Sequence, residues 1–579
     1  MILGKKTRFI SVPLMLCAIL SLFGCEDLTE INKNPDALGD DQVNPAFVLT
    51  GVISSSASRI AYLSFSGNIT QRVVPEAMQY TQRDFLEYSI TNQFAWLKSS
   101  FDYAGLNQPL ANAGYLEQRA RGNQDSLFLK GTAKVMQSLW FGLQTSVWGD
   151  IPYSEALKGT ENLQPVFDKQ IDVFAGVIKS LDEANTALSQ AGPVKSPGIS
   201  KADLLYAGDI TKWRQFANSL RLRYLLRLSA KTTEMKAVGV DVTAEFQKMV
   251  ADPAKYPLMT KAADDAALRF PGTNTTDSYT LGPLITTTTS SFYRIKAAST
   301  MVEFLKQRKD PRLTIWFRPV DVQTLVRDKG ADVVIAKDAA GAVKRYVKTY
   351  QPGLDTALYV GLKIAMTNPD NHNNNLAAHR IEAVALNSAI YNSGATNPFV
   401  SYLGDVYRAN TNPIVKGIFI TASEVNFILA EAASRGWITG SPLTYLQAGI
   451  SASLDHFGIA NGDAKVYNPA SHATVAFDKM AFLNSIEAEY DAAADKLEVV
   501  MQHKWVSSFS TMEGWFDHRR TGYPKIGQNI IDGGKGNQIP IRYIYGDSET
   551  NYNPANTKAA IDRLVPAVND QWSKMWLLQ

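Results

Sequence analysis

Cysteine is almost absent from this 579-residue sequence, which contains only Cys17 and Cys25. Both lie near the N-terminus, so the remaining chain has no thiol to form a disulfide, and its stability must come from packing. A cysteine nucleophile, a zinc ribbon or an iron–sulfur site is excluded there for the same reason. The apolar content of 45% is typical of a chain that buries a sizeable core.

Net charge is also lacking. The chain has 58 basic and 55 acidic residues, which gives a formal charge of +3. Lys5, Lys6 and Arg8 account for the whole excess, and the sequence after them is formally neutral. Because phosphate binding needs a basic field, we expect no nucleic acid partner.

The signatures of common catalytic sites are missing. The sequence has no His-Glu-x-x-His, no Gly-x-Ser-x-Gly and no Walker-type Gly-x4-Gly-Lys pattern. Its histidines share no helical metal-ligand spacing, and the segment 370–375 departs from a calcium loop at several ligand positions. We therefore expect no catalysis, no metal site and no cofactor. Glycoside hydrolysis stays open as an alternative, because it needs only two carboxylates.

A long apolar run occurs at the N-terminus, from Phe9 to Phe23, directly after the basic cluster. At about 15 residues it is shorter than the roughly 20 that a membrane-spanning helix needs, and its order of basic, apolar and small residues is typical of a secretory signal peptide. No second apolar stretch approaches spanning length, so we expect the rest of the chain to be soluble.

Cys25 follows Gly24 at the end of this run. The arrangement resembles the lipobox of bacterial lipoproteins, in which that cysteine is lipidated and becomes the mature N-terminus. We predict a signal peptide over 1–24, a lipidated tether over 25–40 and one domain over 41–579. An ordinary signal peptide cut nearby is the alternative. Glu26-Asp27 resembles the acidic sorting signal of lipoproteins that reach the outer face of an outer membrane.

Helical periodicity dominates the body of the chain. One apolar stripe begins near residue 127, with Ala133 and Gly142 small enough for close helix contact. A second helix is predicted from Asp168 as N-cap, and a third from Asp209. Arg214, Arg223 and Arg227 lie off the third stripe, which indicates a solvated or ion-paired face. A fourth is predicted from the capping box Thr421-Ala-Ser-Glu424 to a C-cap at Gly436.

The predicted fold is mostly α, with degenerate tetratricopeptide-like helical hairpins as scaffold in a single large domain. Long irregular loops and small β segments are expected between about 231 and 415, including a period-2 segment near 342–350, and again over 515–556. Asp517, beside His518 and the pair Arg519-Arg520, is expected in a buried structural ion-pair cluster, and a catalytic group is the alternative.

Six stretches, taken together, resemble the SusD/RagB family of outer-membrane nutrient-binding lipoproteins, in its SusD-like subgroup. They are Trp148-Gly-Asp-Ile-Pro-Tyr-Ser-Glu-Ala-Leu157, Gly208-Asp-Ile-Thr-Lys-Trp213 with the helix after it, Asp310-Pro-Arg-Leu313, the Glu424 to Gly436 helix, Gly514-Trp-Phe-Asp-His-Arg-Arg-Thr-Gly-Tyr-Pro524, and Ile539-Pro-Ile-Arg542 with Asn551-Tyr-Asn-Pro-Ala-Asn556. The resemblance covers nearly the whole chain after Cys25.

The resemblance implies a surface-exposed lipoprotein of the outer membrane that captures an oligosaccharide or peptide. Such proteins act as a lid on a SusC-like TonB-dependent transporter. The quoted motifs identify the family and leave the ligand open. A surface glycoside hydrolase and a periplasm-facing helical-repeat scaffold lipoprotein are the alternatives.

Ligand-binding residues are predicted among aromatic and arginine side chains in loop-like segments. Sugar rings and peptides both use aromatic platforms with polar neighbours. For each candidate, packing in the core or pinning of a loop is the competing interpretation. The candidates are Tyr80, Arg83, Phe85, Tyr88, Phe292, Tyr293, Arg294 and Tyr402.

Overall fold

The computed structural model describes most of the chain after residue 42. The described residues are 43–65, 73–83, 94–96, 98–99, 107–281, 291–321, 323–326, 333–337, 343–347, 355–364, 366, 369, 372–373, 397, 399–509, 511–526 and 538–579. The chain divides into two units, 1–44 and 45–579, and the elements below belong to the second. The predicted signal peptide, Cys25 and the tether lie outside the described residues, so these assignments and the predicted domain bounds stay predictions.

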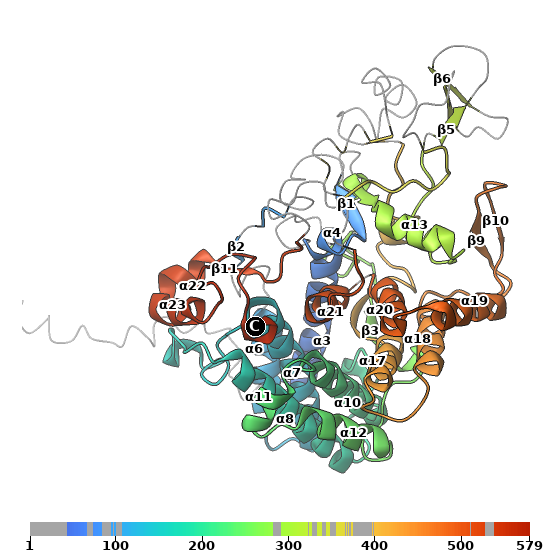
Figure 1. The fold of residues 1–579 in the computed structure, drawn as a ribbon. Coiled ribbons are helices and arrows are strands. Elements are labelled where there is room, and N and C mark those ends of the chain that lie inside the picture. The colour runs from blue at the N-terminus through green and yellow to red at the C-terminus, as the bar shows by residue number, and fades with distance from the viewer. Residues whose placement is uncertain are drawn as a thin grey trace, which may run out of the picture. The chain divides into compact units, whose positions relative to one another are not determined.

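Helices make up most of the described structure, as the sequence predicts (Figure 1). They are α3 (Pro45–Phe65), α4 (Val74–Ala77), α6 (Asn107–Arg119), α7 (Ser126–Trp148), α8 (Gln170–Ala191), α9 (Pro197–Ala202), α10 (Ile210–Arg227), α11 (Thr232–Ala237), α12 (Val242–Ala251), α13 (Ser299–Gln307), α14 (Leu313–Trp316), α17 (Ala422–Ser434), α18 (Pro442–His456), α19 (Lys479–Ala492), α20 (Lys496–Ser507), α21 (Glu513–Thr521), α22 (Asp547–Tyr552) and α23 (Pro554–Asp562).

Strands are short and form small separate sheets. The pairs are β1 (Thr81–Arg83) with β4 (Ile295–Ala297), β2 (Lys98–Ser99) with β11 (Ile544–Tyr545), β3 (Ala266–Arg269) with β8 (Lys416–Ile420), and β9 (Ala464–Asn468) with β10 (Ala473–Ala476). A three-stranded sheet has the order β5 (Gln323–Val326), β7 (Val343–Val347), β6 (Val333–Lys337). Strand β7 confirms the period-2 segment predicted near 342–350.

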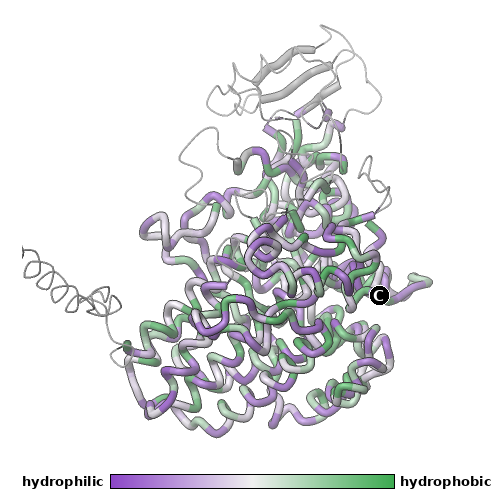
Figure 2. The backbone as a smooth tube through the Cα atoms, turned by 90° about the vertical axis from the view of Figure 1, so that its left-hand side faces the viewer, coloured by the Kyte–Doolittle hydropathy of each residue, from purple (hydrophilic) through white to green (hydrophobic). Residues whose placement is uncertain are grey.

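Successive helices pack against one another, which confirms the hairpin scaffold. Helix α6 contacts α3 and α7, α8 contacts α7 and α10, and α17 contacts both α18 and α20. Gly142 of α7 allows one close approach, because a Cβ there would overlap the ring of Tyr224 on α10. Figure 2 shows hydrophobic and hydrophilic residues interleaved along the helices, as expected where each helix buries one face.

Two of the predicted helix signals are confirmed by hydrogen bonds. The Asp209 carboxylate accepts from the backbone N–H of Lys212 at 3.1 Å, and the Thr421 hydroxyl accepts from that of Glu424 at 3.2 Å. Gly436 follows α17 in the left-handed conformation, with φ of 70°. The Glu424 carboxylate is taken by Arg223, so only the threonine half of the capping box serves the helix end.

The predicted N-cap at Asp168 is wrong. Its carboxylate accepts from the backbone N–H groups of Tyr153 and Ser154, both at 2.9 Å, and therefore ties down the preceding loop. Helix α8 starts two residues later at Gln170, whose N–H donates to Asp150 at 2.8 Å. The carboxylate that serves this helix end thus lies 20 residues upstream, beyond the reach of a local pattern.

Helix α3 differs from the sequence expectation, because within the described residues it alone is long and apolar enough to cross a membrane by length and composition. Its packing is that of a core helix. Leu49, Val52 and Ile53 are fully buried, and α3 contacts α6, α9 and β8. At Gly417 of β8 a Cβ would press on the α3 backbone at Ala57, so the strand lies directly on the helix.

The last residues of the chain complete the core between α7 and α8. The backbone N–H of Leu577 donates to the Gln170 side chain at 2.9 Å, and that side chain donates to the Thr145 carbonyl at 2.6 Å. The Tyr545 hydroxyl donates to the Asp150 carbonyl at 2.8 Å. Segments separated by about 400 positions therefore share one buried hydrogen-bond network.

Candidate ligand-binding site

Tyr80, the first predicted ligand residue, is fully buried. Its hydroxyl donates to the Trp505 carbonyl at 2.8 Å, and its ring stacks on the Trp505 ring with centroids 5.5 Å apart. A Cβ at Gly514 would overlap this hydroxyl, so the glycine of the motif at 514–524 makes room for Tyr80. The structure thus favours packing in the core over ligand binding for Tyr80.

Arg83, Phe292 and Tyr402 are buried as well, around the sheet formed by β1 and β4. Tyr402 bridges to Lys296 of β4, whose ammonium lies 5.0 Å from the Tyr402 ring centroid. Phe292 meets the same ring edge-on at 6.1 Å. The structure therefore packs Phe292 and Tyr402 together with neither ring exposed, while Arg83 is buried opposite Ile295 of β4.

The other candidates are less closely defined. Arg294 is half-buried and directly precedes β4. Phe85 and Tyr88 lie outside the described residues, and so does the side chain of Tyr293. Ligand binding by these four residues stays a prediction.

The predicted ion-pair cluster is confirmed for Asp517 and Arg520, and it joins α17, α20 and α21. His518 and Arg519 instead bond to backbone carbonyls. Arg520 pairs with Glu431 at 2.5 Å and with Asp517 at 2.7 Å, and Lys504 pairs with Asp517 at 2.8 Å. Burial raises the pKa of Glu431, but attraction to Arg520 and the hydrogen bonds from it outweigh burial and lower that pKa to about 2. The cluster holds the helices together, and both of its carboxylates are paired with cations.

Arg223 and Arg227 of α10 form a second buried group. Arg223 donates to both Glu424 oxygens, at 2.6 and 2.7 Å, and Arg227 pairs with Glu513. The ion-paired half of the prediction for these arginines is confirmed, while the solvated half is wrong for both. Arg214, by contrast, donates to backbone carbonyls of 254 and 255 at the surface.

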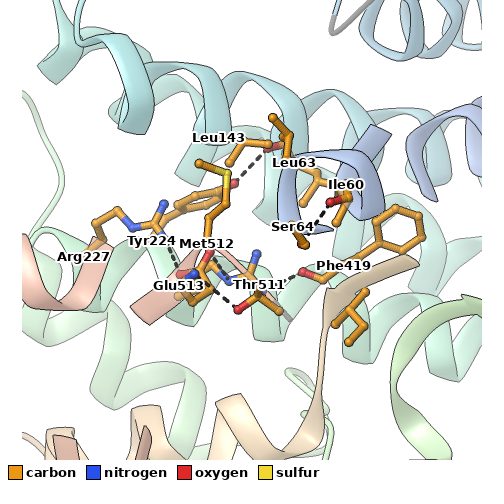
Figure 3. Close-up of a pocket in the computed structure, with 13 residues that line it drawn as sticks. Ile60, Leu63, Ser64, Leu143, Tyr224, Arg227, Phe419, Thr511, Met512 and Glu513 are labelled. Atoms are coloured by element: carbon orange, nitrogen blue, oxygen red, sulfur yellow. Dashed lines mark hydrogen bonds and ion pairs between the residues drawn. The ribbon is translucent and has the colours of Figure 1, made fainter. Parts of the chain in front are cut away.

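A small cavity lies beside these arginines, between α3, α7, α10 and the start of α21. Figure 3 shows Tyr224, Arg227 and Glu513 on one wall, with Ile60 and Leu63 opposite. Its volume is about 30 Å³, and a neighbouring cavity has about 20 Å³. Such volumes suit one or two water molecules and exclude a sugar ring or a peptide side chain.

An open groove of ligand size lies where α3, the start of α6 and strand β3 meet. Its volume is about 840 Å³, within the range of small-molecule sites. We call it the α3–α6 groove. Hydroxyl, amide and guanidinium groups line it, including Ser58, Arg59, Gln108, Asn112 and Arg269. None of these was among the predicted residues, because serine and amide side chains on a helix surface carry no sequence signal of their own.

A second open groove, of about 540 Å³, lies between α13, the β9–β10 hairpin and α19. Two of its charged groups are already satisfied, since Arg308 pairs with Glu489 across it. The remaining wall includes the apolar side chains of Val475, Phe477 and Phe482. This groove therefore offers fewer free hydrogen-bonding groups than the α3–α6 groove.

No cluster of three or more His, Cys, Asp or Glu side chains that could hold a metal ion occurs in the described part of the chain. Two residues of the segment 370–375 are described. The Asn373 amide donates to the carbonyls of Asp355 and Phe399. His372 contacts the Gly361 carbonyl at 3.1 Å. These two side chains pin a turn to neighbouring backbone.

Together, the helical hairpins, small sheets and exposed polar groove define a helical scaffold whose surface can hold a ligand. The family model described as "SusD-like_2: Starch-binding associating with outer membrane" matches residues 38–351 and 357–546. The chain belongs to this SusD-like family, which confirms the resemblance identified from the sequence motifs.

Solved structures agree on the fold. A SusD homolog from Bacteroides fragilis is 20% identical, with a TM-score of 0.66 over 93% of this chain and 100% of the other. A chitin-binding SusD homolog from Flavobacterium johnsoniae is 21% identical, with a TM-score of 0.62 over 92% and 98%. At these identities the likeness establishes the fold alone. No match was found among curated proteins.

Proposed function

We propose that this protein is a lipoprotein of the cell surface that binds an oligosaccharide nutrient without turning it over. It passes the ligand, as a lid, to a SusC-like TonB-dependent transporter in the outer membrane. The observation that carries the proposal is the family match over nearly the whole chain, whose description is starch binding in association with an outer membrane.

Two further observations support a glycan over a peptide. One of the structures with this fold is a chitin-binding SusD homolog. The α3–α6 groove offers hydroxyl and amide groups, each of which can both donate to and accept from sugar hydroxyls. The N-terminal lipobox-like sequence ending in Cys25 supports membrane attachment.

The test is a binding screen of the purified full-length protein against starch and chitin oligosaccharides and against peptide pools. We expect saturable glycan binding with no new reducing ends after prolonged incubation. Release of reducing ends would favour the glycoside hydrolase alternative and overturn the proposal. Binding confined to peptides would replace the ligand class.

The transporter partnership has a separate test. An affinity tag at the C-terminus should recover a β-barrel protein of TonB-dependent type from detergent-solubilised outer membranes. Protease added to whole cells should also cleave the protein. Protection from that protease would support a scaffold facing the periplasm.

A further inference from the structure

The α3–α6 groove has free hydrogen-bonding groups on both of its helical walls. Ser58 and Arg59 of α3, with Gln108 and Asn112 of α6, make no side-chain hydrogen bond or ion pair with the part of the chain that the structure describes. They are only partly buried or exposed. Nearby, the Ser55 hydroxyl already donates a hydrogen bond to the Gly51 carbonyl at 2.5 Å, so its proton is not free to bind a ligand.

Strand β3 adds a second cationic group to this groove. The Nε of Arg269 donates to the Thr411 hydroxyl at 3.1 Å, and its terminal nitrogens have no partner among the described residues. Lys416 lies directly opposite Arg269 in the antiparallel register of β3 and β8. Side chains opposite one another project from the same face of the sheet, and like charges in that position repel.

The carboxylate in the groove does not neutralise these cations. Asp277 accepts hydrogen bonds from the backbone N–H groups of Thr273 and Asn274, at 2.7 and 2.9 Å, and also from the Thr273 hydroxyl. It forms no ion pair with Arg59 or Arg269. Among the described residues, Asp277 is therefore the only carboxylate lining this groove, and its oxygens already accept hydrogen bonds from its own turn. The guanidinium groups of Arg59 and Arg269 and the neighbouring ammonium of Lys416 are left without a counter-charge there.

We propose that the α3–α6 groove binds an acidic saccharide, one that bears carboxylate or sulfate groups. Guanidinium groups bind carboxylate and sulfate in a bidentate manner, and the charge of such a ligand would relieve the repulsion between Arg269 and Lys416. The amides of Gln108 and Asn112 would bind the ring hydroxyls. The proposal rests on the proposed glycan-binding function and adds a ligand class and a location.

Calorimetric titration of the full-length protein tests this directly, with trigalacturonate and a chondroitin sulfate tetrasaccharide as acidic probes and maltotriose as the neutral one. We expect an acidic probe to bind more tightly than maltotriose. Its affinity should fall steeply as salt is raised, because exposed charges are screened over about 10 Å at 0.1 M ionic strength.

Substitutions locate the site. Arg59→Gln and Arg269→Gln should each weaken binding of the acidic probe about tenfold or more, the usual cost of losing a hydrogen bond to a charged group. Arg121→Gln, an exposed arginine after α6, is the matched control and should change nothing. Gln108→Ala should weaken binding by less, and thermal unfolding should confirm that all variants fold.

The outcomes separate this proposal from the proposed function. Acidic binding that survives both arginine substitutions would move the site elsewhere and leave glycan binding standing. Binding of maltotriose with no acidic preference would overturn the ligand class alone. Binding of an acidic peptide such as oligoglutamate, with no glycan bound at all, would overturn both.

Discussion

One cluster of buried charges in this protein is arranged around Glu431, whose side chain is fully buried. Arg520 pairs with it at 2.5 Å, Arg435 at 2.8 Å, and Lys504 lies 3.8 Å away. A carboxylate in that position is costly to desolvate and is retained only because its partners are fixed by three helices. Removing one member therefore costs more than the pair itself contributes.

Glu431→Gln should destabilise the protein by about 3 to 5 kcal/mol, because it leaves Asp517 as the one buried carboxylate that pairs with both Arg520 and Lys504. The free energy of unfolding in urea measures this. Glu183→Gln is the control, since Glu183 pairs with Lys134 at 3.0 Å at a half-exposed position. Surface pairs contribute about 0 to 1 kcal/mol, so a similar loss in both variants would contradict a special role for the cluster.

The same group predicts a pH dependence. The pKa of Glu431 in the folded protein is about 2, below its ordinary value of 4.5. Its contribution is therefore present above about pH 5 and is lost as pH falls towards 2, because the unfolded chain takes up the proton first. Unfolding measured across that range should give a shallower slope for Glu431→Gln than for the natural protein. Equal slopes would show that other carboxyls carry the acid sensitivity.

Gly142→Ala tests the closest helix contact. The added Cβ meets the ring of Tyr224, which cannot move aside because it is buried and its hydroxyl donates to the Leu139 carbonyl at 3.1 Å. We expect a loss of about 1 to 3 kcal/mol. Gly51→Ala on α3 meets nothing within 4 Å and should stabilise by about 0.5 to 1 kcal/mol. Two changes of the same sign would contradict the packing argument.

At the scale of elements, helix ends depend on individual carboxylates and hydroxyls. Asp478 begins α19 and accepts from the backbone N–H of Ala481 at 3.0 Å. Asp478→Ala should cost about 1 kcal/mol of unfolding free energy. Asp491→Ala, at the other end of the same helix, removes a negative charge from the C-terminal turn and should be neutral or slightly stabilising.

The four helices with clear apolar stripes could be predicted from the sequence, because such stripes are local patterns. The strand at 343–347 and the ends at Asp209 and Gly436 follow from the same kind of information. The loops expected over 515–556 are wrong for α21 and α22, whose short helices carry no such stripe. The environment of Arg223 could not be predicted, since its partner Glu424 lies 201 positions away. Polarity at an off-stripe position indicates either solvent or a buried partner, and the sequence does not distinguish them.

The candidate site shows the same limit more clearly. Tyr80 and Tyr402 lie in loop-like sequence, yet both rings are covered by segments far along the chain. Aromatic content in a loop therefore indicated packing at these positions. The α3–α6 groove, in contrast, is formed by three elements that meet only in the folded protein, so no single segment of the sequence predicts it.

At the scale of the whole molecule, we predict that lipidation of Cys25 attaches the protein to the membrane. Cys25→Ser should release the protein from the membrane fraction while leaving its far-ultraviolet circular dichroism unchanged. Residues 45–579 form a compact unit of their own, so we expect that unit to fold without the anchor. Membrane association that persists in this variant would contradict lipidation at Cys25.

The hydrogen bond between Gln170 and Leu577 also has a consequence for the rate of folding. It joins groups that are 407 positions apart in the sequence. Because the entropy of closing so long a loop is lost before the contact forms, we expect this part of the core to form late in folding.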